Sequence, residues 1–153
     1  MIFGGQLVGN SEHWVEPIVS NPIDQLLIDQ LLALKTWAVV GLSNNSERAA
    51  YRVSKLLIEK GHQVIPVHPK AETVHGQQGY AKLSDIPFAV DVVDIFVNSE
   101  LAGEVVDSAI EIKAKGVWLQ LDVIDEAAVD RAGKAGLVTV MNRCPAIEYG
   151  KRI

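Results

Sequence analysis

The chain has 153 residues, which is the size of one ordinary domain, and its 48% hydrophobic and 22% charged residues exclude a disordered chain. The formal net charge of -5 would repel a phosphate backbone, which argues against nucleic-acid binding. The single cysteine, Cys144, excludes an intramolecular disulfide framework and any multi-cysteine zinc site.

Residues 1–20 mix glycines and polar residues with isolated apolar ones, which is typical of a loop. They lack the basic start and continuous apolar run of a secretory signal, and the sequence has no long apolar stretch that would enter a membrane. We therefore expect an irregular N-terminal arm, then one domain over residues 21–153, in a cytoplasmic protein with no membrane partner.

Helix and strand patterns alternate from Asn21 onward. Asn21 is a good helix cap, Pro22 suits the first helical position, and apolar residues then recur at helical spacing as far as Leu34. Later helices are predicted at 46–60, from about 98 to 115 with Gly116 as the stop, and at 125–134. Near-continuous apolar runs predict strands at 37–42, 62–67, 90–97, 117–121 and 137–141.

This alternation predicts the fold class. Apolar strands that alternate with amphipathic helices are typical of an α/β fold, here a single Rossmann-like doubly wound parallel sheet with helices on both faces. Ligands of such sheets bind beyond the carboxyl ends of the strands, where the strand order reverses. We therefore expect the functional residues directly after the strands.

The loop after the first strand begins with Gly41, a tight-turn residue. A dinucleotide fingerprint would have glycines where Ser43 and Ser46 stand, so the complete signature is absent. Backbone amides at the helix start and the Ser43 hydroxyl can still receive a phosphate. The alternative is that Ser43, Asn44 and Ser46 only turn and cap the chain.

Positive charge near the first two strand ends favours a ligand with an extra phosphate. Arg48 ends the first loop and Arg52 follows it, although helix arginines are often simply solvated. His68, Pro69 and Lys70 directly follow the second strand. An NAD site usually has a carboxylate at this second strand end, for the ribose hydroxyls. The lysine instead favours NADP or coenzyme A, unless the loop is an ordinary surface turn.

Several segments, in this order and spacing, resemble the small stand-alone coenzyme A-binding proteins, whose domain is similar to the nucleotide-binding domain of the succinyl-CoA synthetase alpha subunit. The resemblance covers about residues 24–148. It is carried by segments 38–43, 51–53, 64–70, 91–97, 117–120 and 140–145.

The resemblance implies a Rossmann-like fold that holds coenzyme A. The diphosphate would lie near Gly41 and Ser43, and the 3'-phosphoadenosine near Pro69 and Lys70. Three residues after the third strand would flank the adenine or the linker: Phe96, Val97 and Asn98. Gln120, near the end of the fourth strand, can also line the ligand cleft.

The chain departs from this family's pattern at three places. His68 replaces a usual asparagine, which can make the turn that presents Lys70 sensitive to pH. Asp122 replaces a usual glycine and adds negative charge where an acyl or pantetheine arm would pass. Val97 and Asn98 stand where many relatives carry an arginine, which weakens the case for anion binding there.

Other candidate sites have little support. The four histidines lack the spacing of a metal site, so we expect no metal, and no Gly-x-Ser-x-Gly nucleophile elbow occurs. Asp91 and Asp94 are expected to cap the third strand or face solvent. Cys144 lies in a segment that we expect, because of Pro145, to be an open turn rather than a helix start. Its thiol is either buried and inert or close enough to exchange with coenzyme A.

The sequence thus favours a non-catalytic protein that binds coenzyme A or an acyl-CoA. Succinyl-CoA synthetases use a histidine from a further domain, for which this chain is too short. The alternative is an NADP- or NAD-binding oxidoreductase or redox sensor on the same fold, for which no convincing catalytic set is present. Neither the acyl group nor a protein partner is indicated.

Overall fold

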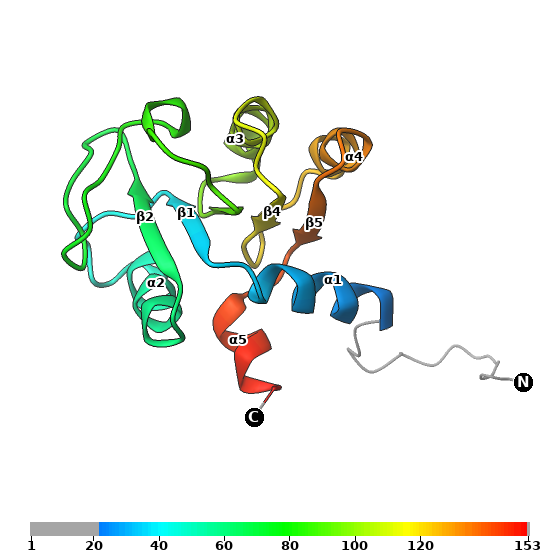
Figure 1. Cartoon of the computed structure of the whole chain (residues 1–153), viewed down its shortest axis with the longest axis horizontal. Coiled ribbons are helices and arrows are strands. Elements are labelled where there is room, and N and C mark those ends of the chain that lie inside the picture. The colour runs from blue at the N-terminus through cyan, green and yellow to red at the C-terminus, as the bar shows by residue number, and fades with distance from the viewer. Residues whose placement is uncertain (1–21, 153) are drawn as a thin grey trace, which may run out of the picture.

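The computed structural model describes residues 22–152, so the arm predicted for residues 1–20 lies outside the described part. Residues 22–152 contain one parallel five-stranded sheet with strand order β2-β1-β3-β4-β5 (Figure 1). The strands are β1 (Thr36–Val40), β2 (Gln63–Val67), β3 (Val92–Ile95), β4 (Gly116–Leu119) and β5 (Val138–Met141). The helices are α1 (Pro22–Leu32), α2 (Ala49–Glu59), the 3-10 turn η2 (Leu83–Asp85), α3 (Ser99–Glu111), α4 (Glu126–Lys134) and α5 (Pro145–Gly150).

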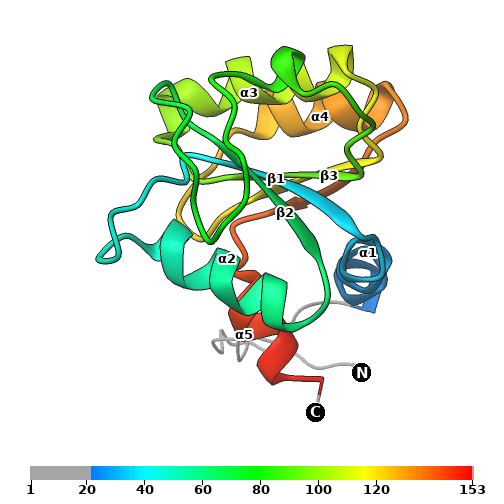
Figure 2. The same cartoon turned by 60° about the vertical axis from the view of Figure 1, so that its left-hand side comes forward.

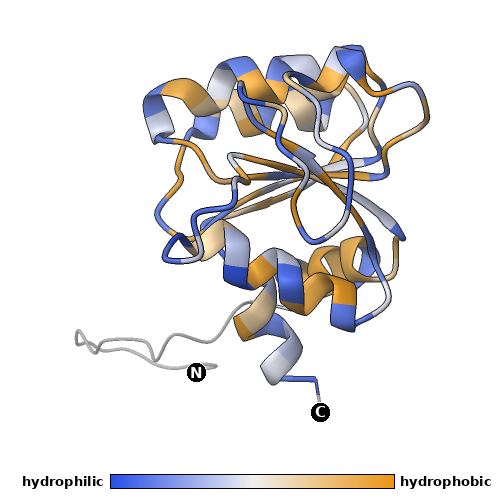
Figure 3. Cartoon of the chain, turned by 90° about the vertical axis from the view of Figure 1, so that its left-hand side faces the viewer, coloured by the Kyte–Doolittle hydropathy of each residue, from blue (hydrophilic) through white to orange (hydrophobic). Residues whose placement is uncertain are grey.

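The helices cover both faces of the sheet. Helices α3 and α4 lie on one face, and α1, α2 and α5 lie on the other (Figure 2). Because successive strand residues point to opposite faces, Ala38 packs toward α3 and α4 while Trp37 and Val39 pack into the cluster under α1, α2 and α5. The strands between the helix layers are largely hydrophobic (Figure 3). The predicted doubly wound, Rossmann-like parallel sheet is confirmed.

The end of α3 differs from the prediction. The helix ends at Glu111 rather than near Lys115, because the chain turns at Lys113, which has a φ of 60°. Gly116 is the first residue of β4 and not a helix stop. A Cβ on Gly116 would lie 2.5 Å from Leu31 Cδ2, so this glycine lets α1 approach the sheet closely.

Two further predictions near strand ends were wrong. The segment after β5 is a helix start, because Pro145 occupies the first turn of α5, where its missing N–H is not needed, and Cys144 is the residue before it. Asp94 neither caps a strand nor faces solvent. It lies within β3 and is 0% exposed.

Candidate functional site

The strand order reverses between β1 and β3. The chain leaves β1 through α2 toward β2 on one side, whereas β3 pairs with β1 on the other side and leads into α3 on the opposite face. Loops diverge at such a switch point and leave a crevice. A cleft of about 590 Å³ lies there, at the carboxyl ends of β1, β2 and β3. We call it the switch-point cleft.

The turn after β1 forms part of this cleft. Gly41 has a φ of +100°, a conformation that side chains with a Cβ rarely adopt. Its N–H donates to the Val67 carbonyl oxygen at 2.8 Å, and a Cβ at this position would lie 2.6 Å from the Phe96 carbonyl oxygen. Only glycine therefore fits between the ends of β2 and β3.

Eight of the predicted site residues line the switch-point cleft together. They come from the loops after β1, β2 and β3, which are far apart in the sequence but adjacent in the sheet. They are Gly41, Ser43, Arg48, His68, Pro69, Phe96, Val97 and Asn98.

Asn44 does not line the cleft but ties two of its loops together. Its Nδ2 donates to the Thr73 carbonyl oxygen at 2.9 Å, and its backbone N–H donates to Glu72 Oε1 at 3.1 Å. These bonds hold the first loop against the loop that follows β2. The structure thus supports a turn-forming role for Asn44.

Arg52 and Lys70 also lie outside the cleft lining. Arg52 Nη1 donates to the Glu47 carbonyl oxygen at 2.8 Å, which braces the start of α2. Lys70 is exposed, and its backbone N–H donates to His68 Nδ1 at 3.1 Å. His68 therefore stabilises the turn that carries Lys70.

Lys82 lines the cleft and was missed by the sequence analysis. The loop after β2 returns beside that strand, because Tyr80 N–H donates to the Pro66 carbonyl oxygen and His68 N–H donates to the Tyr80 carbonyl oxygen, both at 3.0 Å. This pairing brings Lys82 back to the cleft. No local pattern in the sequence signals it.

One side of α3 forms another wall that the sequence analysis missed. Its residues recur at the spacing of one helix face, so a helical stripe beside a predicted strand end was the available signal. The stripe consists of Leu101, Glu104, Val105 and Ser108.

A second groove, of about 600 Å³, adjoins the cleft at the end of β4. We call it the β4 groove. It shares Phe96, Val97 and Asn98 with the cleft, and it contains the remaining predicted residue, Gln120. Gln120 is 7% exposed, and its Oε1 has no hydrogen-bond partner among residues 22–152.

Asp122 lies at the rim of the β4 groove. Its φ of 70° is in the left-handed region that favours glycine. Its backbone N–H donates to Asn142 Oδ1 at 2.7 Å, which holds the turn in place. The backbone of this acidic residue is thus held in place at the rim.

Asp94 is the most perturbed titratable group of the described chain. Both of its carboxyl oxygens are buried without a hydrogen-bond partner there, and burial raises its pKa well above the usual range. It pairs in the sheet with Val39 and Trp118, on the face covered by α1, α2 and α5. It does not line the cleft or the β4 groove.

Cys144 is partly buried and packs against the core cluster that contains Trp37 and Trp118. It lines neither the cleft nor the β4 groove.

Within residues 22–152, no group of three or more His, Cys, Asp or Glu side chains is placed to hold a metal ion. No helix in that range is long and apolar enough to cross a membrane.

Known proteins share this architecture. A solved structure of a hypothetical protein from Pyrococcus horikoshii OT3 has a TM-score of 0.80 and 38% identity, covering 92% of this chain and 98% of that one. An uncharacterised Bacillus subtilis (strain 168) protein, YneT, is 29% identical over 131 residues, which are 86% of this chain and 97% of that protein.

A larger protein contains a similar unit. The dinucleotide-forming acetyl-coenzyme A synthetase 1 of Ca. Korarchaeum cryptofilum has a TM-score of 0.66 and 26% identity, covering 75% of this chain but only 28% of that one. The model of the CoA binding domain family matches residues 35–150, which include every strand of the sheet and every predicted site residue. The chain therefore belongs to the CoA binding domain family.

Proposed function

We propose that this chain is a non-catalytic protein that binds coenzyme A or an acyl-CoA in the switch-point cleft. The diphosphate would lie at the turn after β1, and the 3'-phosphoadenosine beside the loop after β2. The observation that carries the proposal is the turn at Gly41, which opens into the cleft of a chain that belongs to a CoA binding family.

Three features of the first loop suit a diphosphate. Gly41 has no side chain to keep a ligand away from the backbone. Ser43 Oγ accepts the Asn45 N–H at 3.3 Å, so its hydroxyl hydrogen is left to donate to a phosphate oxygen. Arg48 lines the cleft at the start of α2, where the helix dipole also favours an anion.

The far side of the cleft suits a phosphorylated adenosine. Lys82 and His68 line it from the loops around β2, and the exposed Lys70 lies two residues beyond His68. Leu101 and Val105 of α3 add apolar surface against which an adenine ring can pack. A 3'-phosphate would therefore meet positive charge, while the base would meet hydrocarbon.

An NADP- or NAD-binding oxidoreductase is the second candidate, and Glu104 favours it. This carboxylate lines the cleft and can accept hydrogen bonds from ribose hydroxyls. It comes from α3, however, and not from the end of β2, where a dinucleotide site has its acidic residue. The most perturbed acid, Asp94, does not line the cleft, so it cannot serve as a proton donor to a ligand there.

Thermal shift and calorimetry with coenzyme A, NADP and NAD test the proposal. A ligand at about a hundred times its Kd stabilises the fold by about 2.7 kcal/mol, which for a domain of this size raises the Tm by about 5 to 10 °C. We expect coenzyme A to give this shift and NADP and NAD to give less. A shift with NADP and none with coenzyme A would overturn the assignment.

A charge substitution at the first loop tests the diphosphate position. Ser43→Asp puts a negative charge beside the diphosphate and should weaken coenzyme A binding by about tenfold or more, the loss of one charge-assisted contact. Gln63→Glu is the matched control, because it adds the same charge at the opposite end of β2. Equal affinities of the two variants would place the diphosphate elsewhere.

A further inference from the structure

We propose that the β4 groove holds the acyl end of the ligand and selects acyl groups that carry no free carboxylate. This inference rests on the proposed function, because it assumes that the nucleotide occupies the switch-point cleft. The cleft and the groove share Phe96, Val97 and Asn98. A long ligand can therefore cross the end of β3 from one into the other.

Gln120 gives an independent indication of a ligand in the groove. Its side chain lines the groove, it is 93% buried, and its Oε1 lacks a hydrogen-bond partner in the described chain. A buried amide oxygen without a partner is costly, which suggests that the partner comes with the ligand. The pantetheine arm of coenzyme A carries amide N–H and C=O groups. The Gln120 amide can accept a hydrogen bond from an N–H of the arm or, after a half-turn of the amide, donate one to a C=O of the arm.

The charges of the groove are all of one sign. Glu100 and Asp122 line it, and none of its lining residues is Lys, Arg or His. The N-terminus of α3 adds partial positive charge nearby, but Glu100 lies in the first turn of that helix and offsets it. Asp122 is held at the rim by the bond from its N–H to Asn142. A ligand carboxylate placed here would meet two like charges.

The rest of the lining is largely apolar. Ala49, Leu121 and Val123 contribute, together with Phe96 and Val97 from the shared wall. Burying one methylene strengthens binding by up to about fourfold. Short hydrocarbon acyl chains are therefore favoured, whereas repulsion from two partly screened carboxylates weakens a carboxylated chain by about five- to tenfold at low salt.

Butyryl-CoA and succinyl-CoA form a matched pair of probes, because both acyl groups have four carbons and only the second has a free carboxylate. Calorimetry at low ionic strength should show butyryl-CoA binding about five- to tenfold more tightly. The double variant Glu100→Gln/Asp122→Asn should reduce this ratio to about twofold or less, and 0.5 M salt should reduce it in the wild type. Asparagine tolerates the left-handed backbone of Asp122, so the turn is preserved.

Glu111→Gln is the control. Glu111 is an exposed carboxylate at the other end of α3, about 16 Å along the helix from Glu100, so the ratio should not change. A wild-type protein that binds both ligands equally, or a double variant that keeps the full ratio, overturns this inference alone. A protein that binds neither these ligands nor coenzyme A overturns the proposed function together with it.

Gln120→Leu tests the arm separately from the acyl charge. It should weaken coenzyme A about three- to tenfold, the effect of one lost hydrogen bond. It should leave adenosine 3',5'-bisphosphate, which lacks the arm, unchanged. If both ligands weaken by the same factor, Gln120 acts only through the fold and the arm does not lie in the β4 groove.

Discussion

Gly41 passes Phe96 so closely that a Cβ on Gly41 would lie 2.6 Å from the Phe96 carbonyl oxygen. Gly41 also has a φ of +100°, so its backbone conformation and its surroundings both require glycine. This contact joins the turn after β1 to the end of β3. The close approach of these two segments of the switch-point cleft therefore requires a residue without a side chain at position 41.

We expect Gly41→Ala to lower the free energy of unfolding by about 2 to 4 kcal/mol, since it adds backbone strain to a steric clash. It should also weaken coenzyme A binding, because the end of β3 must move. Chemical denaturation and calorimetry measure the two effects. Gly133→Ala in α4 is the control: nothing lies within 4 Å of its Cβ, and alanine should stabilise the helix by up to about 1 kcal/mol. A Gly41→Ala protein of wild-type stability would contradict the geometry.

Lys82 and Lys70 are the two candidate partners of the 3'-phosphate, and their substitutions should have different effects. Lys82 lines the cleft and Lys70 does not, so we expect Lys82→Glu to reduce the preference for coenzyme A over its 3'-dephospho form more than Lys70→Glu does. The expected loss is about tenfold or more, the value of one charge-assisted contact. Calorimetry with both ligands measures it.

Lys55→Glu, on the exposed side of α2, controls for the change in net charge. If Lys70→Glu has the larger effect, the loop after β2 closes over the ligand and the sequence-based choice of Lys70 was the better one. A wild-type protein that does not distinguish the two ligands would remove both lysines from the phosphate site.

The fold was predictable because its signals are local. Each strand is a short apolar run and each helix an amphipathic one, so their alternation is visible without knowledge of contacts. The turn at Gly41 was predictable for the same reason, since a glycine directly after a buried strand indicates a sharp turn. Eight predicted site residues then met in one cleft because parallel strands bring their carboxyl ends together.

The missed features depend on contacts between distant segments. Lys82 reaches the cleft only because Tyr80 pairs with the end of β2. The burial of Asp94 depends on two long-range features: β3 lies in the middle of the sheet, and helices cover both faces of the sheet. Pro145 was predicted to prevent a helix, although a proline in the first helical turn is favourable, so this error was one of interpretation.

Asp94 should make the stability of the fold depend on pH. Burial raises its pKa in the folded protein, so the folded state holds the proton to a higher pH than the unfolded chain does. The free energy of unfolding then falls as pH rises above the ordinary carboxyl range, until the folded protein also loses the proton. The stability that Asp94 contributes is fully present only at acidic pH.

We expect the Tm of the wild type minus that of Asp94→Asn to decrease as pH rises from about 4 to 8. One pH unit between the folded and unfolded pKa values is worth about 1.4 kcal/mol of unfolding free energy, which is about 3 to 6 °C in Tm. Subtracting the two Tm values cancels the contributions of the other titrating groups. Asp85→Asn, which removes an exposed carboxylate, serves as the control. A difference in Tm that stays constant with pH would show that Asp94 is not the titrating group.

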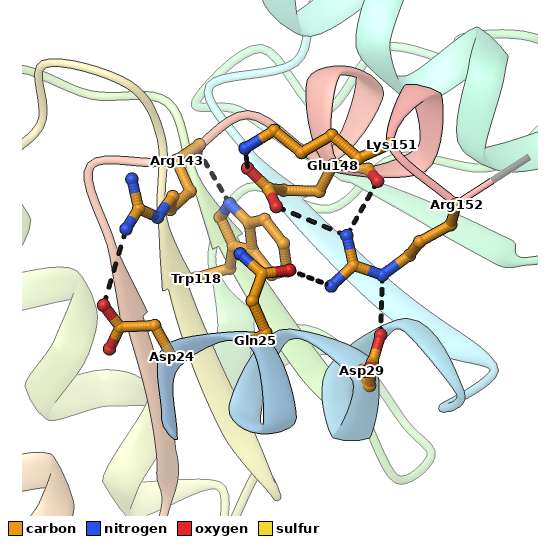
Figure 4. Close-up of polar contacts among 8 residues, drawn as sticks. All are labelled: Asp24, Gln25, Asp29, Trp118, Arg143, Glu148, Lys151 and Arg152. Carbon is orange, nitrogen blue, oxygen red and sulfur yellow. Dashed lines mark hydrogen bonds and ion pairs between the residues drawn. The ribbon is translucent and has the colours of Figure 1, made fainter. Parts of the chain in front are cut away.

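The last helix is held to the first one by Arg152 (Figure 4). Its Nε donates to Asp29 Oδ1 at 2.6 Å and its Nη2 to Gln25 Oε1 at 2.5 Å, both on α1. Its Nη1 contacts Glu148 Oε1 at 3.3 Å and the Glu148 carbonyl oxygen at 2.8 Å. The side chain of Glu148 is only 2% exposed, and its other oxygen pairs with Lys151 at 3.2 Å.

Arg152→Ala should therefore lower the free energy of unfolding by about 2 to 3 kcal/mol, because it leaves the buried carboxylate of Glu148 with one cation instead of two. Adding Glu148→Gln to this variant should recover part of the loss, since the remaining group is then neutral. Arg131→Ala is the control: its pair with Asp107 is about half exposed on both sides, so it should cost no more than about 1 kcal/mol. Urea denaturation of the wild type and of these three variants measures the changes in the free energy of unfolding. Equal losses in Arg152→Ala and Arg131→Ala would mean that α5 is held by its apolar contacts and not by this arginine.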